Sequence, residues 1–176
     1  MTIYEVDGRK PKISKNETYI SPSADIIGDV TIGDNCFIGP GARIKGDYGT
    51  VIIGNRNSIQ ENCVLHARPG EQLEVGNNVT VGHGAILHNC TVKDGVVVGM
   101  GAIVSDYAVL NENCVVGEGA VVRNGQEIPA DNVAVGVPAK IIGPVKPEIR
   151  EKLSRYKNTY VELAKKYLNT AKKISN

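Results

Sequence analysis

Three histidines, His66, His83 and His88, are the residues whose type and spacing in this 176-residue chain best suit chemistry. They lie within 23 residues, and the chain has no other histidine. Neutral imidazoles are ligands of Zn2+, and three of them with an open fourth position are typical of a catalytic zinc site. The alternative is that all three have structural roles and bind only other protein groups.

A six-residue repeat organises the part of the chain that must position these histidines. Apolar residues recur at this spacing over 20–44, 53–65, 75–87 and 92–122. An α-helix, with about 3.6 residues per turn, cannot place this period on one side, whereas short strands can. Three such units form one triangular coil of about 18 residues in a hexapeptide parallel β-helix. The pattern therefore predicts an all-β protein of about six coils.

The repeat register brings His66 and His88 together. Each directly follows a leucine of the repeat, and they are 22 residues apart, four of which are extra loop residues. One coil therefore separates them, which corresponds to about 4.8 Å between neighbouring strands. Two imidazoles at that spacing can bind one ion at the usual Zn–N distance of about 2.0–2.1 Å.

His83 does not share that edge, because it follows Val81 by two residues on the preceding side of the coil. Within one chain it should point away from the other two histidines. A threefold axis would bring His83 of one subunit to the histidine pair of its neighbour. The sequence therefore predicts a homotrimer with three metal sites, each at a subunit interface.

Three further polar residues lie near this point of the register. Lys45 occupies the same place in its hexapeptide as His66, one coil lower, and Gln60 lies on the side that contains His83. Asp47 begins a loop in which extra residues interrupt the repeat. A glutamine side chain can both donate to and accept from a bound substrate. We expect Asp47 to form an ion pair between subunits.

Four cysteines occupy the small inward position of the repeat. This common place indicates packing in the core, where a free cysteine behaves as a small apolar residue. Zinc binding would require outward positions beside the histidines, and a disulfide framework is not expected in a reducing compartment. The residues are Cys36, Cys63, Cys90 and Cys114.

Composition excludes several classes of function. The chain has 20 Lys and Arg against 19 Asp and Glu, so its net charge of +1 does not favour nucleic acid. It has no apolar run long enough to span a membrane. Its first residues, MTIYEVDGRKPK, do not resemble a signal peptide. We therefore expect a cytoplasmic protein that binds neither nucleic acid nor membrane.

The last part of the chain differs from the repeat. Apolar residues at spacings of three and four predict an amphipathic helix, and Pro147 suits its first turn. We therefore divide the chain into a β-helix domain, residues 1–145, and a C-terminal helix packed on it, residues 146–176. The predicted apolar stripe is Ile149, Leu153, Tyr156, Tyr160, Leu163, Tyr167 and Leu168.

The segments KGDYG, NSIQENCVLHA and VGHGAILH, together with GVPAK and TYVELAKKY near the end, resemble the γ-class carbonic anhydrases. The resemblance implies a left-handed parallel β-helix that forms a homotrimer, with a C-terminal helix. It also implies that His66 and His88 of one subunit and His83 of the next bind the metal. The implied reaction is the reversible hydration of CO2 to bicarbonate by metal-bound hydroxide.

The resemblance also suggests roles for the neighbouring residues. Asp47 and Gln60 match the family's Asp and Gln near the metal, where Gln60 would orient hydroxide or bicarbonate. Lys45 replaces the Arg of the family's Arg-Gly-Asp and lacks its bidentate fork. Tyr48 stands where the best-known active members have Glu, and the loop ARPGEQL lacks their proton-relaying acidic segment. Buffer or Tyr48 would then remove the proton.

The metal and the activity remain open at this level. Three histidines suit Zn2+, with Fe2+ or Co2+ as alternatives. Hexapeptide acyltransferases also end in a GVPAK-like segment and use one histidine as a general base beside CoA. A structural trimer that binds metal with weak or no catalysis is the other alternative.

Overall fold

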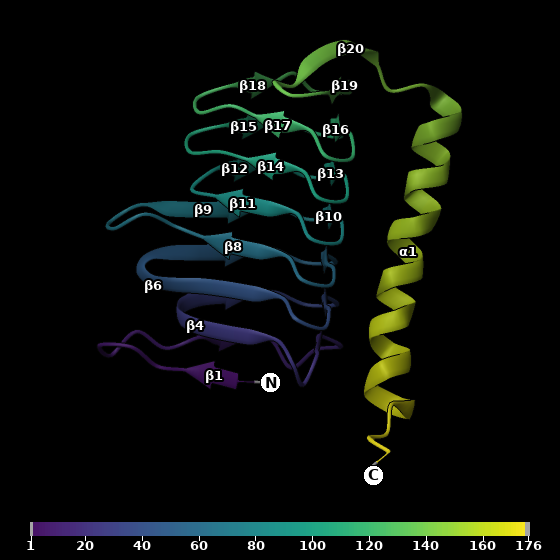
Figure 1. The fold of residues 1–176 in the computed structure, drawn as a ribbon. Helices are drawn as coiled ribbons and strands as arrows, with labels where there is room; N and C mark the ends of the chain where they lie inside the picture. The colour runs from purple at the N-terminus through teal and green to yellow at the C-terminus, as the bar shows by residue number, and fades with distance from the viewer. Residues whose placement is uncertain (1, 175–176) are drawn as a thin grey trace.

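Short parallel strands, stacked one coil above another, form most of the molecule because the repeat supplies one β-branched or leucine side chain per strand for the interior. The computed structural model describes residues 2–174 and is a parallel β-solenoid of about seven turns with one C-terminal helix (Figure 1). The predicted fold class is therefore confirmed.

Most strands have two to four residues, whereas β4 and β6 are longer and bend around a corner of the prism. In chain order the strands are β1 Thr2–Tyr4, β2 Lys12–Ile13, β3 Tyr19–Ile20, β4 Asp25–Ile32, β5 Phe37–Ile38, β6 Arg43–Ile53, β7 Ser58–Ile59, β8 Val64–His66, β9 Gln72–Val75, β10 Thr80–Val81, β11 Ile86–His88, β12 Thr91–Val92, β13 Val97–Val98, β14 Ile103–Val104, β15 Val109–Leu110, β16 Val115–Val116, β17 Val121–Val122, β18 Glu127–Ile128, β19 Asn132–Val135 and β20 Lys140–Pro144.

The strands form three faces. The histidine face consists of β8, β11, β14 and β17 with the first halves of β4 and β6. The second face consists of β9, β12, β15 and β18 with the second halves of β4 and β6. The helix face is the eight-stranded sheet of β3, β5, β7, β10, β13, β16, β19 and β20. Within residues 2–174, the strand pairs are parallel except β19 with β20, which are antiparallel.

The coil count exceeds the prediction by about one. Residues before Ile20 do not follow the hexapeptide pattern, yet β1 and β2 both pair with β4. The sequence period could not reveal this basal coil, because its strands join the ladder through backbone hydrogen bonds rather than through the repeat.

The interior of the prism is a single column of apolar side chains. Repeat residues such as Ile44, Leu65 and Leu87 have no solvent exposure. The four cysteines are free and buried, as predicted. Burial raises the pKa of Cys90 to about 12, so this thiol stays protonated at neutral pH.

The helix α1, Pro147–Thr170, runs beside the helix face, as Figure 1 shows, and contacts β3, β5 and β7. Tyr160 and Tyr167 pack edge-on against Phe37, and Val161 and Ala164 are buried. Part of the predicted stripe is wrong, because Ile149, Tyr156 and Leu168 are exposed. A flat sheet covers a narrower strip of a helix than the periodicity alone suggests. Among the described residues, no helix has the length and apolarity needed to cross a membrane.

Candidate metal centre

His66 and His88 occupy equivalent positions in adjacent coils of the histidine face. Strands β8 and β11 pair in parallel, with His66 opposite His88, so the predicted register is confirmed. Leu65 and Leu87 point into the core, and alternation along a strand turns the next residue outward. The sequence period thus fixes both rings on the same outer edge.

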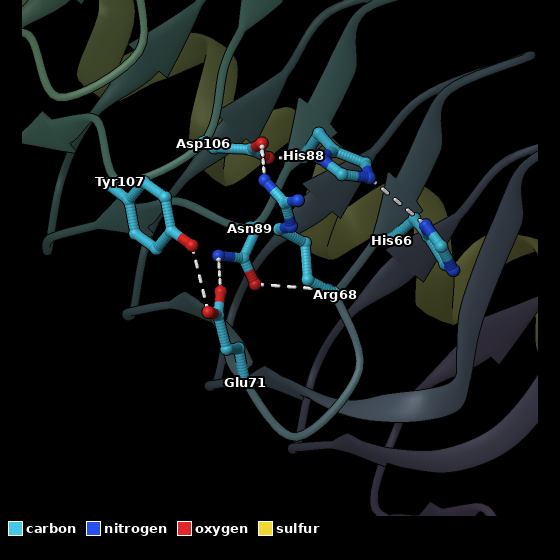
Figure 2. A network of polar contacts seen from close by, with 7 residues as sticks. All are labelled: His66, Arg68, Glu71, His88, Asn89, Asp106 and Tyr107. Atoms are coloured by element: carbon cyan, nitrogen blue, oxygen red, sulfur yellow. Dashed lines mark hydrogen bonds and ion pairs between the residues drawn. The ribbon is translucent and has the colours of Figure 1, made fainter.

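The two rings face each other across a short gap, with centroids 5.2 Å apart. Nδ1 of His66 lies 3.2 Å from Nε2 of His88 (Figure 2). Two nitrogens that bind one tetrahedral zinc ion are about 3.3 Å apart, given Zn–N bonds of about 2.0–2.1 Å. The two ring nitrogens therefore have the spacing of two ligands of one zinc ion. An N–H···N hydrogen bond between the rings also suits this separation in the absence of an ion.

Each of these histidines contacts a carboxylate at its other nitrogen. Nε2 of His66 lies 3.1 Å from Oδ1 of Asp47. Nδ1 of His88 contacts Oδ1 of Asp106, whose Oδ2 accepts from Arg68 at 2.8 Å. A carboxylate behind a histidine fixes the ring orientation and raises the basicity of the nitrogen that faces a metal.

The two carboxyl groups remain ionised because of these contacts. Burial raises the pKa of Asp47, but hydrogen bonds from Lys45 and His66 outweigh it, and the net pKa is lowered. Burial likewise raises the pKa of Asp106, while the hydrogen bond from His88 and the charge of Arg68 lower it below its usual value. The histidine edge thus contains two anionic groups that would complement a cation.

His83 lies on a different edge, at the end of β10 on the helix face. Its Nδ1 is 2.5 Å from Oε2 of Glu61, which belongs to the coil below. This contact occupies one ring nitrogen, and 45% of the side-chain surface remains exposed. Within the described part of one chain, no group of three His, Cys, Asp or Glu side chains is arranged to hold a metal.

Lys45 and Asp47 lie on one side of β6 because residues two apart share a face of a strand. Nζ of Lys45 is 3.0 Å from Oδ2 of Asp47. Within the chain Asp47 thus pairs with Lys45, and the ion pair that we expected between subunits stays a prediction. The contact within the chain joins Lys45 to the histidine edge through the same carboxylate that contacts His66.

The remaining predicted residues have different surroundings. Gln60 is almost fully buried and follows β7, and its backbone N–H donates to Val81 in the strand that precedes His83. Tyr48 is 64% exposed, and its carbonyl accepts from Arg9. In residues 2–174, no hydrogen bond of the Tyr48 hydroxyl is found. The structure thus places Gln60 beside the His83 edge and Tyr48 at the surface.

A polar network holds the loop that follows His66, as Figure 2 shows. The amide of Asn89 donates to Glu71 and accepts from the backbone N–H of Arg68 at 3.1 Å. The hydroxyl of Tyr107 donates to the second oxygen of Glu71 at 2.8 Å, and this bond raises the pKa of Tyr107. The Glu71 side chain is therefore engaged with Asn89 and Tyr107 rather than with the histidines.

Comparisons with known proteins agree with this architecture. A family model described as bacterial transferase hexapeptide (six repeats) matches residues 15–46. A protein of Methanocaldococcus jannaschii named "Probable carbonic anhydrase" is 45% identical over 152 residues, which are 86% of this chain and 95% of that protein. Mitochondrial gamma carbonic anhydrase 2 of Arabidopsis thaliana is 34% identical over 93% of this chain and 60% of its own length.

The chain belongs to the γ-class carbonic anhydrase family. This γ-class chain also resembles a solved structure whose description names a different activity. A Bacillus cereus protein, described as a candidate acetyltransferase, is 37% identical and superimposes with a TM-score of 0.92. The match covers 94% of this chain and 96% of that one. Proteins described as carbonic anhydrases and a protein described as a candidate acetyltransferase therefore resemble the same chain, so the fold alone does not distinguish the two activities.

Sequence reasoning missed two carboxylates of this γ-class chain. Glu61 follows Ile59 by two residues, as His83 follows Val81, so the register contained a signal for their contact. Asp106 offers no such signal, because it lies one residue beyond the position opposite His88 and reaches the ring by its side chain.

Proposed function

We propose that this γ-class chain forms a homotrimer that hydrates CO2 reversibly to bicarbonate at three shared Zn2+ sites. His66 and His88 of one subunit and His83 of the next would bind each ion, and Fe2+ or Co2+ could replace zinc. The observation that best supports this is the 3.2 Å approach of Nδ1 of His66 to Nε2 of His88, each ring having a carboxylate behind it.

The histidine face also offers a surface for assembly. Val64, Ile86 and Ile103 follow one another in register on its outer side, and they are 37–38% exposed in the single chain. A ladder of exposed β-branched residues beside half of a ligand set suits contact with a second copy of the chain. It would bring an edge that contains His83 next to the histidine pair.

Three neutral histidines would leave the full charge of a bound zinc ion to act on water, and the ion would then supply hydroxide at neutral pH, because it lowers the pKa of water from about 15.7 to about 7, a value established for carbonic anhydrases. Asp47, Asp106 and Glu61 would hold the three rings in position. Gln60, buried beside the His83 edge, would orient bicarbonate through its amide.

The product proton must leave the site after each turnover. Glu71 is held by Asn89 and Tyr107, and Tyr48 is exposed at the surface. We therefore propose that the proton passes directly to buffer. Tyr48, which is exposed to solvent and adjoins Asp47, is the side chain that could pass it on. The rate should then increase with buffer concentration at constant pH.

The four free cysteines suit a reducing compartment, and we propose the cytoplasm as the location.

The test combines metal analysis of anaerobically purified protein with a CO2 hydration assay. We expect close to one metal ion per chain, activity that a chelator removes, and loss of both in His83→Ala with the trimer retained. Retained metal in His83→Ala would refute the ligand set. Stoichiometric metal without hydration would instead favour the structural trimer.

Sharing between subunits has a sharper test in mixed trimers of His66→Ala and His83→Ala chains, isolated with two affinity tags. Each mixed trimer of either composition has one intact site, so about a third of the wild-type metal content and activity should return. Absence of both in verified mixed trimers would refute sharing.

A second candidate, acyl transfer from CoA, is favoured by the similarity to the Bacillus cereus protein described as a candidate acetyltransferase. Such an activity would use one histidine as a general base and would survive chelation. Acyl transfer that persists after metal removal would support this candidate over hydration.

A further inference from the structure

A cavity of about 480 Å3 lies between the first turns of α1 and the corner that precedes the strands of the helix face. Arg56, Asn78, Gly95 and Asn113 line it from successive coils, since they precede β7, β10, β13 and β16. The α1 side contributes one helical stripe, which contains Arg150, Leu153, Ser154, Lys157 and Asn158. The cavity belongs to a different edge from the histidine pair.

Three cationic side chains, Arg56, Arg150 and Lys157, face one carboxylate, Asp94, in this lining. Asp94 already accepts from the backbone and side-chain N–H groups of Asn77 at 2.7 and 3.2 Å. The lining therefore has excess positive charge, and its carboxylate is engaged in a turn.

Both arginines are held in place but keep donors for a ligand. Nε of Arg56 donates to Asn78 and one of its Nη groups donates to Asn158, each at 2.9 Å. Nη1 of Arg150 is 2.7 Å from Asp131. A guanidinium has five N–H donors, so neither set of contacts uses all of them. Fixed guanidinium groups suit bidentate recognition of oxyanions.

Lys157 shows that the positive charge in the cavity is incompletely balanced. Its ammonium donates to the carbonyl of Gly95, and the described residues include no carboxylate within ion-pair distance of it. Burial, with a smaller effect of Arg150, lowers the pKa of Lys157 to about 8. A bound anion would compensate for this desolvation.

We propose that this cavity binds a phosphate-class oxyanion, through the Arg56 and Arg150 guanidinium groups and the Lys157 ammonium. Asn78, Asn113 and Ser154 line the same space and supply polar groups for the remaining oxygens. The volume exceeds what a phosphate group needs and lies within the range of small-molecule sites. A phosphate monoester with a small organic part therefore fits as well as free phosphate does. This proposal is independent of the proposed hydratase activity.

The test is titration of the purified holoprotein with inorganic phosphate and with glycerol 3-phosphate, by calorimetry at low ionic strength. We expect saturable binding that weakens at least about tenfold in Arg56→Gln and in Lys157→Gln, because each variant removes a charged hydrogen-bond donor. Lys166→Gln, which removes an exposed lysine of the same helix, should bind as the wild type does. Tighter binding of the ester than of phosphate would assign a phosphate monoester to the cavity, and weaker or equal binding of the ester would assign the oxyanion alone.

Circular dichroism and size-exclusion chromatography must show that each variant is folded. Arg56 lies in an exposed turn, so its substitution should not disturb the fold. If Lys157→Gln does not fold, the phosphate affinity of Arg56→Gln decides the test. Absence of saturable binding up to about 10 mM would overturn the proposal, since weaker binding corresponds to less than about 3 kcal/mol. Equal binding by the wild type, Arg56→Gln and Lys166→Gln would also overturn it, because phosphate would then bind elsewhere.

Discussion

Each of the three histidines is paired with a carboxylate, and this pairing is the chief finding at the scale of single residues. Asp47, Glu61 and Asp106 come from three different parts of the chain, yet each contacts an imidazole nitrogen. A carboxylate in this position orients the ring and stabilises one tautomer. Each of the three proposed ligands therefore has a carboxylate that would orient its ring.

Asp106→Asn should weaken zinc binding by about 10–100-fold, because the neutral amide holds His88 less firmly and donates less charge to it. The dissociation constant can be measured by competition with a chromophoric chelator. Glu127→Gln is the control, since this exposed carboxylate accepts from Asn111 and, among the described residues, contacts no histidine. Equal affinities in the two variants would mean that Asp106 does not support the site.

Lys157 should make the stability of the fold depend on pH. Its pKa is about 8 in the folded chain and about 10.5 when unfolded, so the unfolded chain binds more protons between these values. The free energy of unfolding of the wild type should therefore rise with pH from about 8 to about 10, relative to Lys157→Gln. We expect a relative gain of about 1–2 kcal/mol, after a discount for the partial exposure of this side chain.

Urea denaturation of both proteins at pH 7.0 and at about pH 10 provides the measurement. Other groups that titrate in this range are common to the two proteins and cancel in the difference. Parallel stability profiles would show that Lys157 is not desolvated.

At the scale of elements, the three residues of β11 point in alternating directions and have three different environments. In β11, Ile86 is outward and partly exposed, Leu87 is fully buried, and His88 lies on the outer edge. The alternation of a strand separates core packing from surface contact within adjacent residues. The same division in β8 explains how a repeat that stabilises the core also places His66 and His88 side by side on the surface.

Leu87→Ala should lower the free energy of unfolding by about 2–5 kcal/mol, because it leaves a cavity in the close-packed column. Val109→Ala is the control variant, since it shortens an outward side chain of a strand on the second face, away from the proposed subunit contact, and it should cost about 1 kcal/mol. Denaturation at equal protomer concentration measures both. Similar losses in the two variants would contradict the assigned orientation of β11.

At the scale of the whole molecule, one chain presents the two parts of the proposed ligand set on different edges. His66 and His88 lie on the histidine face, whereas His83 follows a strand of the helix face. The exposed ladder of Val64, Ile86 and Ile103 adjoins the first part. Assembly and metal binding should therefore be coupled.

Ile103→Glu should convert the trimer to monomers and remove the metal, because it places a charge in the apolar contact. The solenoid should persist, since the side chain is not part of the core. Light scattering, metal content and circular dichroism measure the three effects. Val109→Glu, on the outer side of the second face, should remain trimeric and loaded. Monomers of Ile103→Glu that keep stoichiometric metal would disprove the shared site.

Much of this protein follows from its sequence because a six-residue period fixes which residues become neighbours. Once three units form a coil, positions one coil apart lie in adjacent strands whatever their side chains are. The buried cysteines and the His66–His88 pair could therefore be predicted without a structure. The extra basal coil could not, because backbone pairing rather than the period adds it to the solenoid.

Only the tertiary structure decided the contacts that depend on side-chain reach and on how α1 packs. Asp106 reaches His88 from outside the register, Lys45 pairs with Asp47 in the same chain, and Lys157 meets Gly95 across the helix interface. These contacts depend on the path of a loop or on the docking of a helix. A repeat specifies neither of these, because it determines the positions of strands relative to one another and nothing beyond them.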